Sequence, residues 1–260
     1  MNDPFSVRVG AILSADIAVP EHERELRFYS SVLGTGEGPL WREDLLNNRG
    51  MPIIGLGVRG ADYAHLPLQW MPHIYVADVA VSVERAIELG GTELMHGKDD
   101  DGKSQWAVLL DPNGAAFGII PVASSDAITP VEAADTPVGR IYWVDLTVSD
   151  ASTTRDFYQQ VVDWSVREIE MEDAGEPYAD YNMCDAHGSL VARVFHARGV
   201  NVGLPPTWVI HLPVGDLAES VRRVREEGGR VVRAAQGNDG EYSHVVVEDL
   251  VGAYLALVPG

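Results

Sequence analysis

The segment formed by residues 73–114 occurs a second time in the chain, as residues 211–252. The matching residues lie 138 positions apart throughout: His73 and His211, Asp78 and Asp216, Gly91 and Gly229, Asp111 and Asp249, Gly114 and Gly252. A spacing that stays constant over this length indicates internal duplication, which constrains the architecture before any other argument does. The chain is therefore expected to fold as two similar parts.

The repeated segment has the pattern of a strand, a helix and a hairpin. It begins with a β-branched and aromatic run at residues 72–79. Apolar residues then recur at i, i+4, i+7 and i+8, which places them on one face of a helix, and Gly90-Gly91 ends that helix. Residues 106–110 and 116–120 are strand-like, and the turn Asp-Pro-Asn-Gly at 111–114 joins them. The repeat is thus predicted to be a compact βαβ-type unit.

A second pattern precedes the repeat in each half of the chain. Residues 9–19 read as a strand, Pro20 breaks it, and a helix is expected to continue to Leu33. In the second half, residues 142–146 read as the matching strand, and Ser152 is expected to cap the helix that follows. Each half is therefore predicted to hold two modules in succession.

The spacing between the two halves changes once along the chain. Phe157-Tyr158 take the place of Phe28-Tyr29 at a spacing of 129, whereas Gly188 follows Gly50 at a spacing of 138. The second half therefore carries nine extra residues, and we expect them to extend a hairpin at residues 170–181.

These patterns predict an α+β fold in which each half forms a curved mixed sheet from its two modules. The first domain is expected at residues 8–121 and the second at residues 140–259. Residues 122–139 contain small side chains and prolines but no aromatic residue, so we interpret them as a linker. We expect the two domains to superpose with the same strand order.

Charge limits the partners that the chain can have. It contains 39 acidic and 19 basic residues, for a formal net charge of -20. An acidic surface repels phosphate groups, so we expect neither nucleic acid nor an anionic membrane as a partner.

Cys184 is the only cysteine, so no disulfide can form within the chain, and we interpret it as a packed thiol. The first six residues lack the basic and apolar regions of a signal peptide, and no apolar run approaches membrane-spanning length. A cytoplasmic location is therefore expected.

Several of these motifs together resemble the vicinal oxygen chelate superfamily, which includes glyoxalases, bleomycin resistance proteins and extradiol dioxygenases. The resemblance rests on Phe-Tyr in the first helix, the run at 72–79, Glu-Leu-Gly-Gly at 88–91 and Asp-Pro-Asn-Gly-Ala-Ala-Phe-Gly at 111–118. It covers nearly the whole chain except the linker. It implies two tandem glyoxalase-like domains, each a pair of βαβββ modules around a cup, without implying one particular chemistry.

Metal-dependent members of that superfamily use up to four ligands per site, typically His or Gln, Glu, His and Glu. The resemblance places the ligand positions at Ser14, Gly55, His73 and Gly118 in the first domain, and at Trp143, Arg193, His211 and Ala256 in the second. A first-row divalent metal needs about three or four nitrogen, oxygen or sulfur ligands. Because one histidine remains in each set, we expect neither a metal nor another cofactor, and we interpret both histidines as hydrogen-bonded residues at strand ends.

The cup of the first domain is the predicted ligand site, because glycine and serine leave space there. Side chains two positions apart on a strand share a face, so Asp16 accompanies Ser14. Asp16 and His73 are the candidate catalytic residues, as an acid–base pair. The predicted substrate-binding set is Ser14, Asp16, Gly55, His73, Tyr75 and Gly118.

The cup of the second domain is predicted to be structural, with the set Trp143, Asp145, Arg193 and His211. Trp143 fills space, and Asp145 shares its face. A guanidinium in a partly closed space needs a partner, because its charge resists desolvation. We therefore predict an internal ion pair between Arg193 and Asp145 that closes this cup.

The function favoured by the sequence is small-molecule binding by a tandem glyoxalase-like protein that lacks the family's metal site. The first alternative is a metal-dependent lyase or dioxygenase, with ligands such as His65, His96 or His187. The second alternative is a protein that sequesters a drug or natural product, as resistance members of the family do. The sequence leaves open whether the chain is an enzyme and whether it forms a homodimer.

Overall fold

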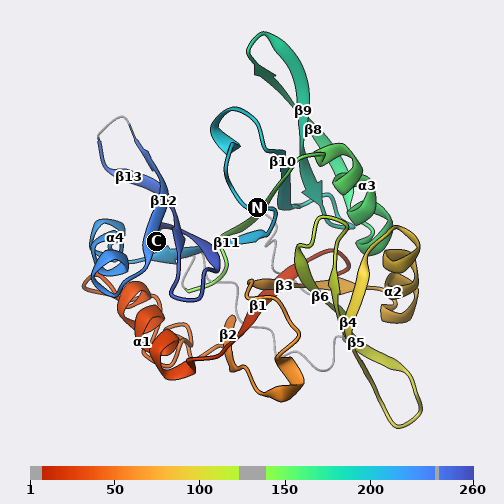
Figure 1. The fold of residues 1–260 in the computed structure, drawn as a ribbon, viewed down its shortest axis with the longest axis horizontal. Helices are drawn as coiled ribbons and strands as arrows, with labels where there is room; N and C mark the ends of the chain where they lie inside the picture. Colours follow the sequence, from red (N-terminus) through yellow and green to blue (C-terminus); the bar gives the residue numbers. More distant parts are fainter. Residues whose placement is uncertain (1–7, 123–138, 238–239) are drawn as a thin grey trace. The chain divides into compact units, whose positions relative to one another are not determined.

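The computed structural model describes residues 8–122, 139–237 and 240–260 (Figure 1). The first half contains β1 (Ile12–Val19), α1 (His22–Leu33), β2 (Ile54–Val58), η1 (Ala61–Tyr63), β3 (Met71–Val76), α2 (Val79–Glu88), β4 (Thr92–Lys98), β5 (Ser104–Leu110) and β6 (Ala116–Pro121). The second half contains β7 (Trp143–Val148), α3 (Ala151–Val162), β8 (Ser165–Asp173), β9 (Glu176–Cys184), β10 (Leu190–His196), η3 (Gly199–Asn201), β11 (Trp208–Val214), α4 (Leu217–Glu226), β12 (Arg230–Gln236), β13 (Tyr242–Glu248) and β14 (Tyr254–Pro259).

The predicted fold class is confirmed: the fold is mixed α+β, with curved open sheets, few helices and the same element order in both repeats. The two halves differ between their first helix and the strand that pairs with their first strand. In the second half, β8 and β9 form the hairpin predicted from the extra residues, paired from Ser165 and Cys184 to Asp173 and Glu176. In the first half that place is taken by a loop with one isolated bridge, between Trp41 and Asn47. Most of the predicted linker, residues 123–138, lies outside the described residues.

The fold divides into two compact units that differ from the two halves of the sequence. Among the described residues, unit 1 comprises residues 8–13, 71–122 and 144–208, and unit 2 comprises residues 14–70, 139–143, 209–237 and 240–260. Each unit thus takes two modules, one from each half of the chain. The domain boundaries predicted at 8–121 and 140–259 follow the sequence repeat and stay a prediction.

Unit 1 contains two sets of four strands and the helices α2 and α3, which lie side by side (Figure 1). One set runs in the order β3-β6-β5-β4, and the other in the order β7-β10-β9-β8. In each set the first pair is parallel and the remaining pairs are antiparallel. Both sets therefore repeat one topology.

Unit 2 contains the parallel pair β1 and β2, the set β12-β13-β14-β11, and the helices α1 and α4. Strands β11 and β14 are parallel, and β13 is antiparallel to both β12 and β14. The last module of the chain therefore has the topology of the second module.

Local chemistry explains the helix ends, with one correction to the sequence analysis. Gly90 has a φ of 87°, which is the left-handed conformation expected of a helix C-terminal cap. The N-cap of α3 is Asp150, and the prediction of Ser152 was wrong: an Asp150 carboxylate oxygen accepts from the backbone nitrogen of Thr153 at 3.1 Å. The hydroxyl of Ser152 donates to that same carboxylate at 2.6 Å and, with the other bonds, holds the Asp150 pKa well below its usual range. An ionised carboxylate at the first turn also matches the helix dipole.

A buried tyrosine–aspartate hydrogen bond lies at the centre of unit 1. The hydroxyl of Tyr158, on α3, donates to Asp111 Oδ2 at 3.3 Å and accepts from Trp208 Nε1 at 2.9 Å. Asp111 Oδ1 also accepts from the backbone nitrogens of Asn113 and Ala115, at 2.8 and 2.9 Å. Desolvation raises the pKa of Asp111, and these hydrogen bonds oppose that rise.

The same arrangement lies at the centre of unit 2. The hydroxyl of Tyr29, on α1, donates to Asp249 Oδ2 at 2.6 Å and accepts from Trp70 Nε1 at 3.0 Å. Asp249 Oδ1 accepts from the backbone nitrogens of Val251 and Ala253, at 3.0 and 2.7 Å. In both units the tyrosine and the aspartate come from different halves of the sequence.

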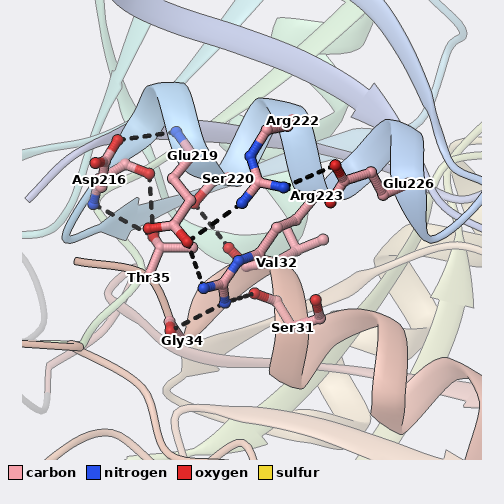
Figure 2. A network of polar contacts seen from close by, with 10 residues as sticks. All are labelled: Ser31, Val32, Gly34, Thr35, Asp216, Glu219, Ser220, Arg222, Arg223 and Glu226. Atoms are coloured by element: carbon pink, nitrogen blue, oxygen red, sulfur yellow. Dashed lines mark hydrogen bonds and ion pairs between the residues drawn. The ribbon is translucent and has the colours of Figure 1, made fainter.

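A polar network joins α1 and α4 within unit 2 (Figure 2). The hydroxyl of Ser220 donates to the carbonyl of Val32 at 2.7 Å. The guanidinium of Arg223 donates to the carbonyls of Ser31 and Gly34, at 2.8 and 3.3 Å, near the C-terminal end of α1. These carbonyls would otherwise lack helical partners, so α4 caps α1 and fixes its orientation.

None of the helices in the described residues is long and apolar enough to cross a membrane.

Removing the tyrosine hydroxyl is expected to destabilise the fold. Tyr29→Phe and Tyr158→Phe each remove a hydrogen bond to a buried carboxylate and leave an indole N–H without its partner, so each should lower the free energy of unfolding by about 1–3 kcal/mol. Urea denaturation measures the effect. Tyr63→Phe, in a half-exposed tyrosine, is the matched control and should change the free energy by less than about 0.5 kcal/mol. Equal effects of all three substitutions would contradict the prediction.

Candidate ligand-binding site

The parallel pair β1 and β2 brings Asp16 and Gly55 together. They are direct partners in the register, and both are partly exposed. A Cβ atom at position 55 would overlap Oδ1 of Asp16 and lie 2.9 Å from its Cγ. The Asp16 carboxylate therefore lies across Gly55 and uses the space that any side chain there would need. Ser14, two residues before Asp16 on β1, is also partly exposed.

The parallel pair β3 and β6 brings His73 and Gly118 together in the same way. They are register partners, and a Cβ atom at position 118 would overlap Cδ2 of His73 and lie 3.1 Å from its Nε2. The imidazole therefore covers the Gly118 backbone. Tyr75, two residues further along β3, is opposite Ile120 and only 6% exposed, and burial raises its pKa.

The predicted ligand-binding residues thus fall into two pairs of neighbours and two single residues. Asp16 with Gly55, and Ser14, belong to unit 2, whereas His73 with Gly118, and Tyr75, belong to unit 1. At both glycines, the position is occupied by the side chain of the neighbouring strand. A carboxylate could be introduced there only by displacing Asp16 or His73.

The corresponding positions of the second half have the same registers but different side chains. Asp145 pairs with Arg193 across β7 and β10, where the first half has Asp16 and Gly55. The Arg193 Nε donates to Asn182 Oδ1 at 3.1 Å, a partner that the sequence analysis missed. The register makes Asp145 a near neighbour, and the predicted ion pair between the two stays a prediction.

His211 pairs with Ala256 across β11 and β14, which is the register of His73 and Gly118. Its ring stacks on that of His244, with centroids 4.9 Å apart and planes 27° apart. His211 is only 6% exposed, and Trp143, the first residue of β7, is partly exposed. The hydrophobic pattern could not reveal this stack, because His244 lies on β13, far from His211 in sequence.

A histidine–aspartate pair in unit 1 was also missed by the sequence analysis. Asp180 Oδ1 accepts from the backbone nitrogen of His196 at 2.7 Å and lies 3.2 Å from its Nδ1. Asp180 is fully buried, and Tyr178 meets the imidazole edge-on at 5.6 Å. A carboxylate at Nδ1 fixes the tautomer that leaves Nε2 able to accept a proton, which suits general base chemistry. No local motif signals this pair, because pairing of β9 with β10 brings the two residues together.

The histidines proposed as ligands outside the family positions have other surroundings. His65 and His187 are exposed in loops. His96 lies 3.2 Å from Glu93 through Nδ1 and 2.8 Å from the Ser104 hydroxyl through Nε2, so both of its nitrogens have partners. Across the described ranges, no three His, Cys, Asp or Glu side chains are grouped so that they could hold a metal ion.

The single cysteine is a packed thiol, as expected. Cys184 is fully buried at the end of β9, and desolvation raises its pKa. A thiol with a raised pKa is a poor nucleophile, because the thiolate is the reactive form.

Two family models match the chain, one to each half. A model described as a glyoxalase-like domain matches residues 14–120, and one described as the glyoxalase/bleomycin resistance protein/dioxygenase superfamily matches residues 140–256. Together they span most of the sequence and follow the repeat.

Among curated proteins, the anthracycline biosynthesis protein DauV from Streptomyces sp. (strain C5) is 27% identical over 172 residues. The match covers 66% of this chain and 59% of that protein, so the chain spans less than two thirds of its relative's length.

Among solved structures, a catechol 2,3-dioxygenase superposes with a TM-score of 0.54 at 13% identity, covering 97% of this chain and 93% of that one. A 2,2',3-trihydroxybiphenyl 1,2-dioxygenase from Sphingomonas wittichii strain RW1 superposes with a TM-score of 0.52 at 14% identity, covering 97% and 91%. At these identities the likeness concerns the fold alone.

Substitution of Gly55 should reveal the position of the Asp16 side chain. Gly55→Ala is expected to lower the free energy of unfolding by about 1–2 kcal/mol, because the new methyl group displaces the Asp16 carboxylate. Gly57→Ala, on the same strand, is the matched control. A Cβ there has its nearest neighbour at 3.8 Å, so this change should be neutral or stabilise by up to about 1 kcal/mol.

Asp16→Ala should remove the penalty of Gly55→Ala in a double-mutant cycle measured by urea denaturation, because the two side chains no longer compete for space. Additive effects of the two substitutions would show that Asp16 does not lie over Gly55.

Proposed function

The chain belongs to the glyoxalase/bleomycin resistance protein/dioxygenase superfamily, and on that premise we propose that it binds a small organic molecule through its first domain, without a family-type metal site. The observation that carries the proposal is that side chains of neighbouring strands occupy the space beside Gly55 and Gly118. Asp16 lies over Gly55 and His73 lies over Gly118, where metal-dependent members would supply carboxylates. The strands thus carry polar side chains suited to a ligand.

The residues present do not fit the metal of the family. A first-row divalent ion takes about three or four protein ligands of suitable chemistry. The four family positions of the first domain supply one imidazole, one hydroxyl and two glycines, and neither glycine can be replaced by a ligating residue without displacing its neighbour.

The side chains favour an uncharged, hydroxylated or aromatic ligand. Asp16 accepts hydrogen bonds from hydroxyl groups, and His73 donates or accepts according to its tautomer. A net charge of -20 disfavours an anionic ligand. A relative named for anthracycline biosynthesis supports a polycyclic aromatic natural product as the ligand class.

A second candidate function is acid–base catalysis at His196. The observation in its favour is the buried Asp180 carboxylate at Nδ1, which is the arrangement of an oriented general base. Turnover distinguishes catalysis from sequestration. An enzyme that uses His196 would convert its ligand to product, and His196→Ala would abolish product formation. A sequestering protein would bind the ligand and form no product.

Ligand binding should depend on both first-domain side chains. Catechol and an anthracycline aglycone are the probes for a thermal-shift titration, since a ligand at 100 times its Kd stabilises the folded state by about 2.7 kcal/mol. Asp16→Ala and His73→Ala should each weaken binding by roughly 10-fold or more, through loss of a hydrogen bond. His65→Ala, in an exposed loop, is the control. Unchanged binding in both variants would place the ligand elsewhere.

Elemental analysis tests the second part of the proposal. We expect the purified protein to hold no stoichiometric zinc, iron, manganese or nickel, and EDTA treatment to leave its thermal stability unchanged. About one metal ion per chain, lost on His73→Ala, would overturn the proposal and favour a metal-dependent lyase or dioxygenase.

A further inference from the structure

Glu25 on α1 is a buried carboxyl group in unit 2 for which neither the fold nor the proposed ligand site accounts. It is fully inaccessible to solvent and lies on the same face of the helix as Phe28 and Tyr29. Within the described residues, neither of its carboxylate oxygens has a hydrogen-bond partner. Buried carboxylates are almost always paired, because an unpaired charge in a protein interior is costly.

The related position in unit 1 shows what Glu25 lacks. Thr154 on α3 corresponds to Glu25 on α1. The Thr154 hydroxyl accepts from Asn113 Nδ2 at 2.9 Å and donates to the carbonyl of Asp150 at 2.9 Å. Asn113 belongs to the turn that holds Asp111. In unit 2 the residue that corresponds to Asn113 is Val251, whose side chain has no donor.

The groups around Glu25 do not compensate for its charge. Asp249, held by the Tyr29 hydroxyl and two backbone nitrogens, adds a second negative charge nearby. On α1 itself, Arg24 attracts the carboxylate and Glu21 repels it.

The elements packed against α1 use their polar groups elsewhere. The Arg223 guanidinium on α4 donates to carbonyls at the other end of α1, and the Leu56 carbonyl on β2 accepts from His22.

We infer that Glu25 holds a proton in the folded protein near neutral pH, and that its ionisation weakens unit 2 as the pH rises. The protonated, uncharged form has the lower free energy for a carboxyl group that is buried without a hydrogen-bond partner beside a second carboxylate. Unit 2 therefore carries an alkaline-sensitive position, and unit 1, with Thr154 and Asn113, lacks it.

The direction of the pH effect follows from proton linkage. Burial, then Asp249, raises the Glu25 pKa from 4.5 to about 7 in the folded state. The folded state therefore binds more protons than the unfolded state between these two values, and stability falls as the pH rises through that window. By about pH 8, roughly one unit above the folded-state pKa, Glu25 is ionised in both states and the loss is nearly complete.

The test compares the wild type with Glu25→Gln by urea denaturation at several pH values. Between about pH 5 and about pH 8 the unfolding equilibrium constant of the wild type should rise roughly 70-fold more than that of Glu25→Gln, which cannot ionise. Glu23→Gln, in an exposed residue of the same helix, is the control, and its pH dependence should stay within a few-fold of the wild type. Parallel curves for the wild type and Glu25→Gln would overturn the inference.

A spectroscopic measurement keeps the test independent of unfolding. In folded protein near pH 6, infrared spectroscopy should detect the carbonyl stretch of a protonated carboxylic acid, and Glu25→Gln should lack that band. The band should disappear as the pH is raised past about 8. If the change in the spectrum between about pH 6 and about pH 8 is the same in the wild type and in Glu25→Gln, Glu25 is ionised throughout.

A pair of substitutions transfers the chemistry of unit 1 to unit 2. Glu25→Thr combined with Val251→Asn should recreate the hydrogen bond between Thr154 and Asn113, and the double variant should lose the extra pH dependence. A double variant that retains the wild-type pH slope would assign the slope to groups other than Glu25.

Discussion

The hydrogen bond from a buried tyrosine to the aspartate of a tight turn is the interaction on which both compact units depend. Tyr29 and Asp249 form it in unit 2, and Tyr158 and Asp111 form it in unit 1. Each aspartate also holds the backbone of its own turn, so one carboxylate fixes a hairpin and attaches a helix to it. Burial opposes the charge of such a group, and the surrounding N–H and O–H donors make the charge tolerable.

Both units contain this tyrosine–aspartate hydrogen bond, and they differ in the residues around it. The Gly229 backbone lies so close to the Phe28 ring that a Cβ there would be 2.7 Å from it, and Gly91 lies in the same way against Phe157. Only a residue without a side chain permits this approach, which explains the second glycine of each pair, whereas the first glycine has a positive φ. The strand registers are likewise shared, whereas the residues differ: Gly55 and Gly118 in the first half correspond to Arg193 and Ala256 in the second.

The sequence predicted what depends on local pattern. Helical periodicity, the glycine caps and the Asp-Pro-Asn-Gly turn located α2, β5 and β6 within a few residues. The spacing change predicted the β8–β9 hairpin, because an insertion in a repeat must be accommodated locally. The cap of α3 was misassigned because Ser152 and Asp150 are both good capping residues, and only the backbone geometry distinguishes the residue that precedes the first turn.

The rest depends on pairing between distant segments. The partner of Tyr29 is 220 residues away, and that of Arg193 lies on another strand, so neither leaves a trace in local periodicity. The filling of Gly55 by Asp16 also requires the register of β1 and β2, since the sequence shows only that a ligand residue is missing. The composition of the compact units was not predictable for the same reason: repeats show which modules are alike, and not which modules pack together.

The exchange of modules between halves has a consequence for synthesis on the ribosome. Tyr158 follows Asp111 by 47 residues, but Asp249 follows Tyr29 by 220. At an elongation rate of about 5–20 residues per second, Tyr29 is synthesised roughly 10–45 seconds before Asp249. Unit 1 can therefore close before residues 209–260 of unit 2 have been made, and during this interval α1 lacks its contacts with α4 and Asp249. α1 precedes α4 by nearly two hundred residues, yet its packing is completed only after α4 has been made.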